Sequence, residues 1–108
     1  MKGKTYAFKR TDDKAIEKLI DDDPVMINHM VIPPGDEVPE HAANSNVYLV
    51  LVRGRMRLAL GGEAEDYGAG NIVNVEFCTR MHITNPFEEV LEFFVVKAPS
   101  PRVMDSTG

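Results

Sequence analysis

The sequence predicts an all-β protein, an antiparallel sandwich or barrel formed by a single domain. Its 108 residues can bury one hydrophobic core but not two. Short apolar segments rich in β-branched residues follow one another closely along the chain, and glycines or prolines separate them. Strands joined by glycine turns at such short intervals are typical of antiparallel sandwiches and barrels.

Two elements are expected before the first long strand. Residues 5–9 alternate in polarity, with Tyr6 and Phe8 on one face, which predicts an opening strand. Thr11 suits the N-cap of a short N-terminal helix, because acidic residues follow it and apolar residues then recur at helical spacing. This helix is expected to end near Asp22, because Pro24 disfavours helical geometry in the residue before it.

From Val25 onward the pattern is that of strands. The segment VYLVLV is apolar on both faces and is expected to be buried on both. Gly54 permits a tight turn, and the pair Gly61-Gly62 ends the next strand. Residues 98–108 contain two prolines and are expected to form a tail that is extended along a neighbouring element or disordered, which leaves residues 1–97 as the single domain. The expected strands cover residues 25–32, 47–52, 56–60, 64–67, 72–75 and 90–96.

Composition excludes several classes of function. A net charge of −5 repels nucleic-acid backbones, and no apolar run reaches the length of about 18 residues that spans a membrane. The N-terminus has no apolar stretch typical of a secretory signal, so we expect a cytoplasmic protein. Cys78 is the only cysteine, which excludes an internal disulfide. Strands that are apolar on both faces leave an outer face to be covered, and a homodimer is the simplest cover.

The stretch from Gly35 to Gly54 resembles the first signature of the cupin superfamily, G-x5-H-x-H-x3-4-E-x6-G. His41 occupies the place of the first histidine. Ala43 stands where the second histidine is expected, and Val47 stands where the glutamate is expected. The turns and strands of the signature are therefore present, while two of its three metal ligands are replaced by apolar residues.

The second cupin signature, G-x5-P-x-G-x2-H-x3-N, is matched at its ends by Gly70 and Asn85. Cys78 takes the place of its inner glycine, Met81 takes the place of its histidine, and His82 lies one position later. The likeness covers about residues 25–97. It implies a cupin-type antiparallel β-jelly roll, also called a double-stranded β-helix.

A metal site of the cupin kind uses four ligands. Of the four positions that match them in this chain, only one holds a residue that can bind a metal, His41. Protein sites for divalent ions normally supply three or four ligands, so one imidazole is too few. Two arrangements would supply a second histidine ligand. A one-residue bulge before His82 would turn that side chain inward. His29 would contribute if the odd-numbered side of residues 25–32 faced the cavity; in similar cupins the even-numbered side faces inward, which places His29 outside.

We therefore interpret the chain as a barrel that binds a small, partly apolar molecule without the usual cupin metal. The residues expected around the barrel mouth are His41, Asn28, Tyr48 and Met81. The alternative is a metal-dependent cupin enzyme of the dioxygenase, isomerase or decarboxylase type, in which His41 and either His82 or His29 hold a divalent metal. A third hypothesis is a structural or regulatory dimer module that binds no small molecule.

Overall fold

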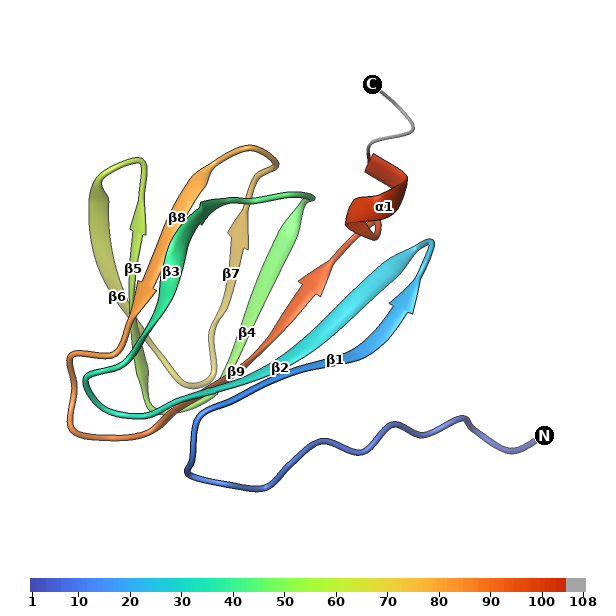
Figure 1. The fold of residues 1–108 in the computed structure, drawn as a ribbon, viewed down its shortest axis with the longest axis horizontal. Coiled ribbons are helices and arrows are strands. Elements are labelled where there is room, and N and C mark those ends of the chain that lie inside the picture. Colours follow the sequence, from blue (N-terminus) through green and yellow to red (C-terminus); the bar gives the residue numbers. More distant parts are fainter. Residues whose placement is uncertain (105–108) are drawn as a thin grey trace.

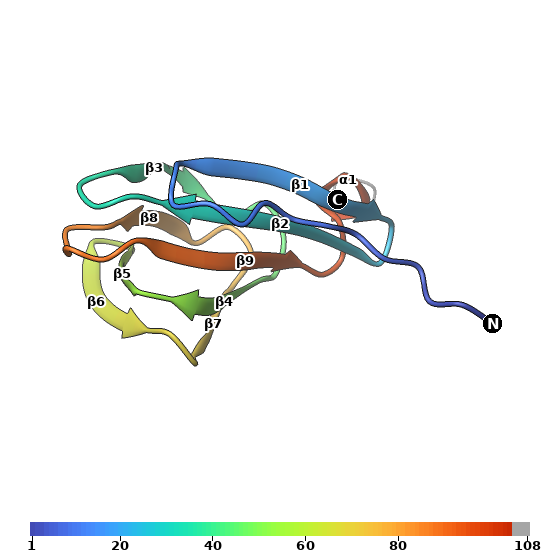
Figure 2. The ribbon, with the colours of Figure 1, turned by 90° about the horizontal axis from the view of Figure 1, so that it is seen from below.

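The structure, a computed structural model, describes residues 1–104 and consists of two antiparallel sheets that face each other (Figures 1 and 2). The five-stranded sheet has the order β1-β2-β9-β4-β7, and the four-stranded sheet has the order β3-β8-β5-β6. This confirms the predicted all-β jelly roll. The strands are β1 (Ala15–Asp22), β2 (Val25–Ile32), β3 (Glu37–Ala42), β4 (Val47–Arg53), β5 (Arg55–Leu60), β6 (Glu63–Gly68), β7 (Ile72–Val75), β8 (Arg80–Thr84) and β9 (Leu91–Lys97).

The hydrophobic core lies between the two sheets. Every second residue of β4 and β9 points into it, so Leu49, Leu51 and Phe93 are buried almost completely. On β2 the even-numbered side chains face this core, as the resemblance implied, and Ile32 is fully buried. The buried side chain of Asn85 links the end of β2 to the segment before β9, because its amide donates to the backbone carbonyls of Ile32 and Glu89 at 2.9 and 2.8 Å.

The predicted N-terminal helix is wrong, because residues 15–22 form strand β1 at the edge of the five-stranded sheet. β1 pairs with β2, and the register shifts between Lys18 and Ile20, so Leu19 is an extra, bulged residue. The bulge breaks the period of two and gives the apolar residues of this segment a helical spacing. Hydrogen bonding to β2 outweighs that local pattern.

The predicted strand over residues 5–9 is also wrong: these residues are extended but pair with no strand. The segment passes over the outer face of the five-stranded sheet, in front of β2 in Figure 2. The ring of Phe8 lies 4.7 Å from His29 and 4.9 Å from Phe94, measured between centroids. The chain thus covers part of its own outer sheet face. Val52 and Ile72 stay exposed on that face, so the homodimer remains a prediction.

The described part of the C-terminal tail is attached to the barrel. Residues Pro101–Met104 form the short helix α1, and Arg102 donates to the Asp23 carboxylate at the β1–β2 turn. The hydroxyl of the buried Ser100 donates to Asp21 at 2.9 Å. The last residues of the predicted tail, 105–108, lie outside the described residues. Within residues 1–104, no helix has the length and apolar character needed to cross a bilayer.

Cys78 has a backbone φ of 72°, a left-handed conformation that costs a residue with a Cβ about 1–2 kcal/mol. The cupin signature has glycine at this position. We expect Cys78→Gly to raise the free energy of unfolding by about 0.5–1 kcal/mol, since the released strain exceeds the entropy that glycine gains when unfolded. Urea unfolding under reducing conditions measures the change. Cys78→Ala removes the thiol and keeps the Cβ, so a gain of equal size in that variant would contradict the explanation.

Candidate functional site

A cavity of about 170 Å³ lies between the two sheets, on the inner faces of β2, β3, β4, β8 and β9. Its lining is mostly apolar, with Leu49 and Phe93 among the buried contributors. The polar side chains that reach it are Asn28, His41, Asn44 and Lys97. A small pocket with an apolar wall and a few convergent polar groups is the usual form of a small-molecule site.

The four positions that match the cupin metal ligands all line this cavity. His41 is on β3, Ala43 and Val47 are on the connection to β4 and at its start, and Met81 is on β8. Met81 lies directly opposite His41 in the β3–β8 ladder. The positions matched by the two signatures therefore meet at one cavity in the structure. Three of the four hold apolar residues, which make this part of the cavity wall apolar.

A bulge turns His41 toward the cavity. The β3–β8 register shifts between Val38 and His41, so both side chains line the cavity although they are three residues apart. Pro39 lies inside the bulge, where its missing N–H breaks no ladder hydrogen bond. The His41 Nδ1 lies 2.9 Å from the Pro39 carbonyl oxygen. A carbonyl can only accept, so Nδ1 carries the proton and Nε2 of the neutral ring remains an acceptor.

Asn28 projects from the middle of β2 into the same cavity. Its Oδ1 is buried and accepts no hydrogen bond from any residue of the described chain. Buried side-chain oxygens are nearly always hydrogen-bonded, because leaving one unpaired costs about 1–3 kcal/mol. Asn28 thus presents an unused acceptor to whatever occupies the cavity.

Lys97, at the end of β9, was missed by the sequence-based prediction. It has the same parity as Phe93 and Val95, and this alternation in LEFFVVK was the signal that could have placed it on the inner face. Desolvation lowers the pKa of the Lys97 amine below its ordinary value, and the like charge of Lys18 lowers it further. The cavity therefore holds a cationic group that burial already disfavours.

The structure does not bring all the predicted site residues together. His41, Asn28 and Met81 meet at the cavity, whereas Tyr48 points to the outer face of β4 and accepts a hydrogen bond from the Asn46 amide at 3.1 Å. The proposed bulge before His82 is absent. The irregularity is in the opposite strand β3, and β8 keeps a regular register with β5, so His82 faces away from the core, 3.4 Å from a Glu37 carboxylate oxygen.

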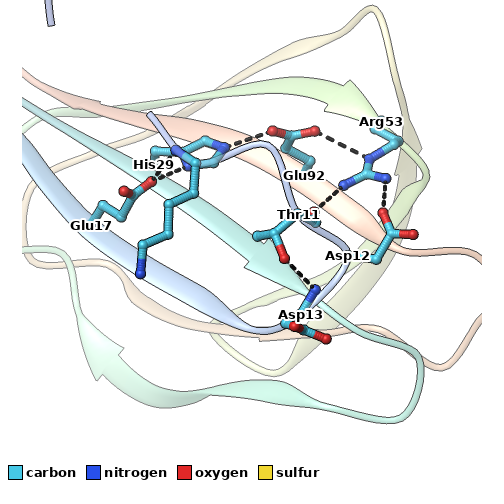
Figure 3. A network of polar contacts seen from close by, with 8 residues as sticks. Thr11, Asp12, Asp13, Glu17, His29, Arg53 and Glu92 are labelled. Atoms are coloured by element: carbon cyan, nitrogen blue, oxygen red, sulfur yellow. Dashed lines mark hydrogen bonds and ion pairs between the residues drawn. The ribbon is translucent and has the colours of Figure 1, made fainter. Parts of the chain in front are cut away.

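His29 lies on the opposite side of the five-stranded sheet from the cavity and is fully buried there. Figure 3 shows its ring between the side chains of Glu17 and Glu92. Its Nδ1 is 2.6 Å from a Glu17 carboxylate oxygen, and its Nε2 is 2.6 Å from a Glu92 carboxylate oxygen. Two carboxylates can both be satisfied only if both ring nitrogens donate, which requires an imidazolium. Arg53 continues the chain of contacts by donating to Glu92 and to Asp12 of the N-terminal segment.

The hydrogen bond from His29 lowers the pKa of the Glu17 carboxyl, and a second one from the backbone N–H of Lys9 lowers it further. This network attaches the N-terminal segment to the sheet. A hollow of about 690 Å³ lies beside it and is lined by Arg10, Arg53, Glu92 and their neighbours. Arg53 and Glu92 are already paired with each other and with Asp12 and His29, so we regard this hollow as structural.

The cavity residues do not fit a metal ion of the cupin kind. His41 is the one imidazole at the cavity, because His29 and His82 point to the outer faces of their sheets. Within residues 1–104 no group of three or more histidine, cysteine, aspartate or glutamate side chains is arranged to hold a metal. Three apolar side chains stand at the other ligand positions, and a bare charge beside them would be poorly solvated.

Comparisons with known proteins agree with this fold. The protein MJ0764 of Methanocaldococcus jannaschii is 45% identical over 105 residues, which are 95% of this chain and 90% of that protein. Its crystal structure, described as an RmlC-like cupin family protein with a double-stranded β-helix fold, superimposes with a TM-score of 0.92 over 97% of this chain and 98% of its own. No family model matches the sequence.

More distant structures share the fold. A cupin superfamily protein from Desulfitobacterium hafniense is 13% identical, with a TM-score of 0.74 over 87% of this chain and 84% of its own. A Cupin 2 conserved barrel domain protein from Salinispora arenicola is 19% identical, with a TM-score of 0.68 over 96% of this chain and 82% of its own. At such low identity these likenesses concern the fold alone.

Proposed function

This chain belongs to the cupin superfamily, and we propose that its barrel binds a small, partly apolar molecule without a resident metal ion. The observation that carries this proposal is the cavity itself. It keeps the place of the cupin metal site, yet its wall is mostly apolar and its polar groups are an imidazole, two amides and an amine. Such groups orient an organic molecule through hydrogen bonds, whereas they are too few in ligand atoms for a divalent ion.

The size of the cavity supports a small ligand. A volume of about 170 Å³ equals the space of roughly five or six water molecules in the liquid, at about 30 Å³ each. Burying an apolar molecule against side chains such as Leu49 and Phe93 contributes about 25 cal/mol per Å² of area removed from water.

A blocked cavity tests this proposal. Ala43 lines the cavity, whereas its neighbour Ala42 is exposed and absent from the lining, so Ala43→Leu fills the site and Ala42→Leu is its matched control. A panel of small metabolites is screened by ¹H–¹⁵N NMR and by melting temperature. We expect at least one compound to shift cavity resonances and raise the melting temperature of the wild type and Ala42→Leu, but not of Ala43→Leu.

Metal analysis of untagged protein completes the test, with His41→Ala as the comparison. Iron, manganese, nickel or zinc at one ion per chain, lost in His41→Ala, would contradict the proposal and favour a metal-dependent enzyme of the dioxygenase, isomerase or decarboxylase type. A panel that leaves every cavity resonance unchanged would contradict it in another way, and would favour the structural or regulatory module.

A further inference from the structure

Two lysines flank Asn28 on the inner face of the five-stranded sheet: the exposed Lys18 of β1 and the partly buried Lys97 of β9, of which only Lys97 lines the cavity. Lys18 of β1 lies directly opposite Asn28 in the β1–β2 ladder. On the other side of β2, Asn28 is paired with Val95 of β9, and Lys97 is two residues further along the same face. Diagonal neighbours of this kind lie about 7–8 Å apart between Cα atoms, within reach of a long side chain. Lys97 and the Asn28 amide therefore border the same part of the cavity.

Among residues 1–104 no ion pair joins an acidic side chain to Lys18 or Lys97. None of the residues that line the cavity is an aspartate or a glutamate. Within residues 1–104, Lys97 forms no ion pair, and unlike the unpaired Lys18 it is only partly exposed. A cation left unpaired in a partly buried, mostly apolar site favours an anionic partner, because the partner compensates the cost of burying the charge.

Two further observations limit the chemistry of that anion. Burial and the charge of Lys18 both lower the pKa of the Lys97 amine, so a negative charge beside it would relieve both effects. The Oδ1 of Asn28 is buried and without a partner in the described chain, so a donor group on the ligand can pair with it. The rest of the wall, which includes Leu49 and Phe93, is apolar and suits a hydrocarbon body.

We propose that the ligand of this barrel is a small organic acid whose carboxylate pairs with Lys97, whose hydroxyl group donates to Asn28 Oδ1, and whose short hydrocarbon body fills the cavity. This inference rests on the proposed function, because it names the chemical class of the molecule bound there. His41 Nε2, an acceptor in the neutral ring, offers a second site for a hydroxyl hydrogen at the cavity mouth.

Three related compounds serve as probes: 2-hydroxy-3-methylbutanoate, its uncharged primary amide, and 3-methylbutanoate, which lacks the hydroxyl. Each is titrated into the wild type, and the backbone resonances of the cavity residues are followed by ¹H–¹⁵N NMR. We expect the hydroxy acid to bind about tenfold or more tightly than its amide, because hydrogen bonds to charged groups are about twice as strong as neutral ones.

Four variants identify the groups responsible. Lys97→Met keeps an unbranched apolar side chain and is expected to weaken the hydroxy acid about tenfold while leaving the amide within about twofold. Lys97→Arg keeps the charge and the preference for the acid. Lys14→Met removes one positive charge outside the cavity and is the matched control. Asn28→Val is expected to abolish the preference for the hydroxy acid over 3-methylbutanoate.

The possible outcomes separate this inference from the proposed function. If the amide shifts the cavity resonances at the same concentrations as the acid, or if Lys97→Met binds the acid as well as the wild type does, the inference is overturned while the binding barrel stands. If none of the three probes shifts the cavity resonances while neutral members of the metabolite panel do, the inference alone is again overturned. If neither probes nor panel reach the cavity, both proposals fail.

Discussion

Gly54→Ala is expected to destabilise the fold by roughly 3–5 kcal/mol, a large share of the 5–15 kcal/mol that stabilises a typical domain. Gly54 has a φ of 76°, where a Cβ costs about 1–2 kcal/mol. The added Cβ would also lie 2.2 Å from the carbonyl oxygen of Val90 and 3.2 Å from the Cα of Leu91. Both are backbone atoms, so the β4–β5 turn or the start of β9 has to move, at a cost comparable to overpacking a core.

Two other glycines separate the strain from the collision. Gly61 has a φ of 56° and no atom within 4 Å of an added Cβ, so Gly61→Ala should cost only the conformational strain of about 1–2 kcal/mol. Gly68 has neither a positive φ nor a close neighbour, so Gly68→Ala should be nearly neutral. Urea unfolding followed by circular dichroism gives the three values. Equal losses at Gly54 and Gly61 would show that the contact with Val90 does not matter.

Replacing His29 by leucine is expected to cost about 3 kcal/mol or more at neutral pH. The ring is fully buried and lies between the Glu17 and Glu92 carboxylates, each at 2.6 Å. Removing one partner of a buried ionic group typically costs about 3–5 kcal/mol, because the remaining charges lose their compensation. The leucine keeps the apolar contact with Phe8, so the loss reports mainly on the charges.

The stability lost in His29→Leu is expected to depend on pH. The pKa of the Glu17 carboxyl is lowered in the folded protein, chiefly by the hydrogen bond from His29, so this bond adds stability above the ordinary carboxyl value of 4.5. That stability is lost as the pH falls through the lowered value. The difference between the wild type and His29→Leu should therefore shrink below pH 4.5 in urea unfolding measured from pH 7 to pH 3.

His82→Leu is the matched control, because this histidine has a single carboxylate neighbour, at 3.4 Å, on a partly exposed face. It should change stability by less than about 0.5 kcal/mol. A His29→Leu protein as stable as the His82→Leu protein would mean that the pair of glutamates is not compensated by the ring.

The parts of the site that could be predicted from the sequence are those that depend on turn residues and on the alternation of side chains along a strand. Gly35, Gly54 and Gly70 have positive φ angles at turns, which matches their places in the two signatures. The inward parity of β2 put Asn28 at the cavity and His29 outside it. These inferences held because a turn needs a residue that tolerates its φ, and because side chains of a strand alternate between faces.

Other parts depend on contacts that no local pattern records. Residues 15–22 have a helical spacing of apolar side chains, yet they pair with β2 through a bulge at Leu19. Strand β3 was not expected, because its side chains are mostly exposed and it contains a proline. The Glu17–His29–Glu92 cluster joins residues that are 12 and 63 positions apart. Only the pairing of β1, β2 and β9 brings these three side chains together.

The sequence by itself determined an antiparallel all-β fold, because turns and strand parity are local properties of the chain. Its likeness to the two cupin signatures added the jelly roll, the place of the cavity and the apolar residues at three of the four metal-ligand positions. The tertiary structure decided what the cavity contains: it brought Lys97 beside Asn28, kept His82 and Tyr48 out, and left the amine without a carboxylate among the described residues. The net charge of a cavity depends on side chains from strands that are distant in the chain, so it is fixed only when those strands pair.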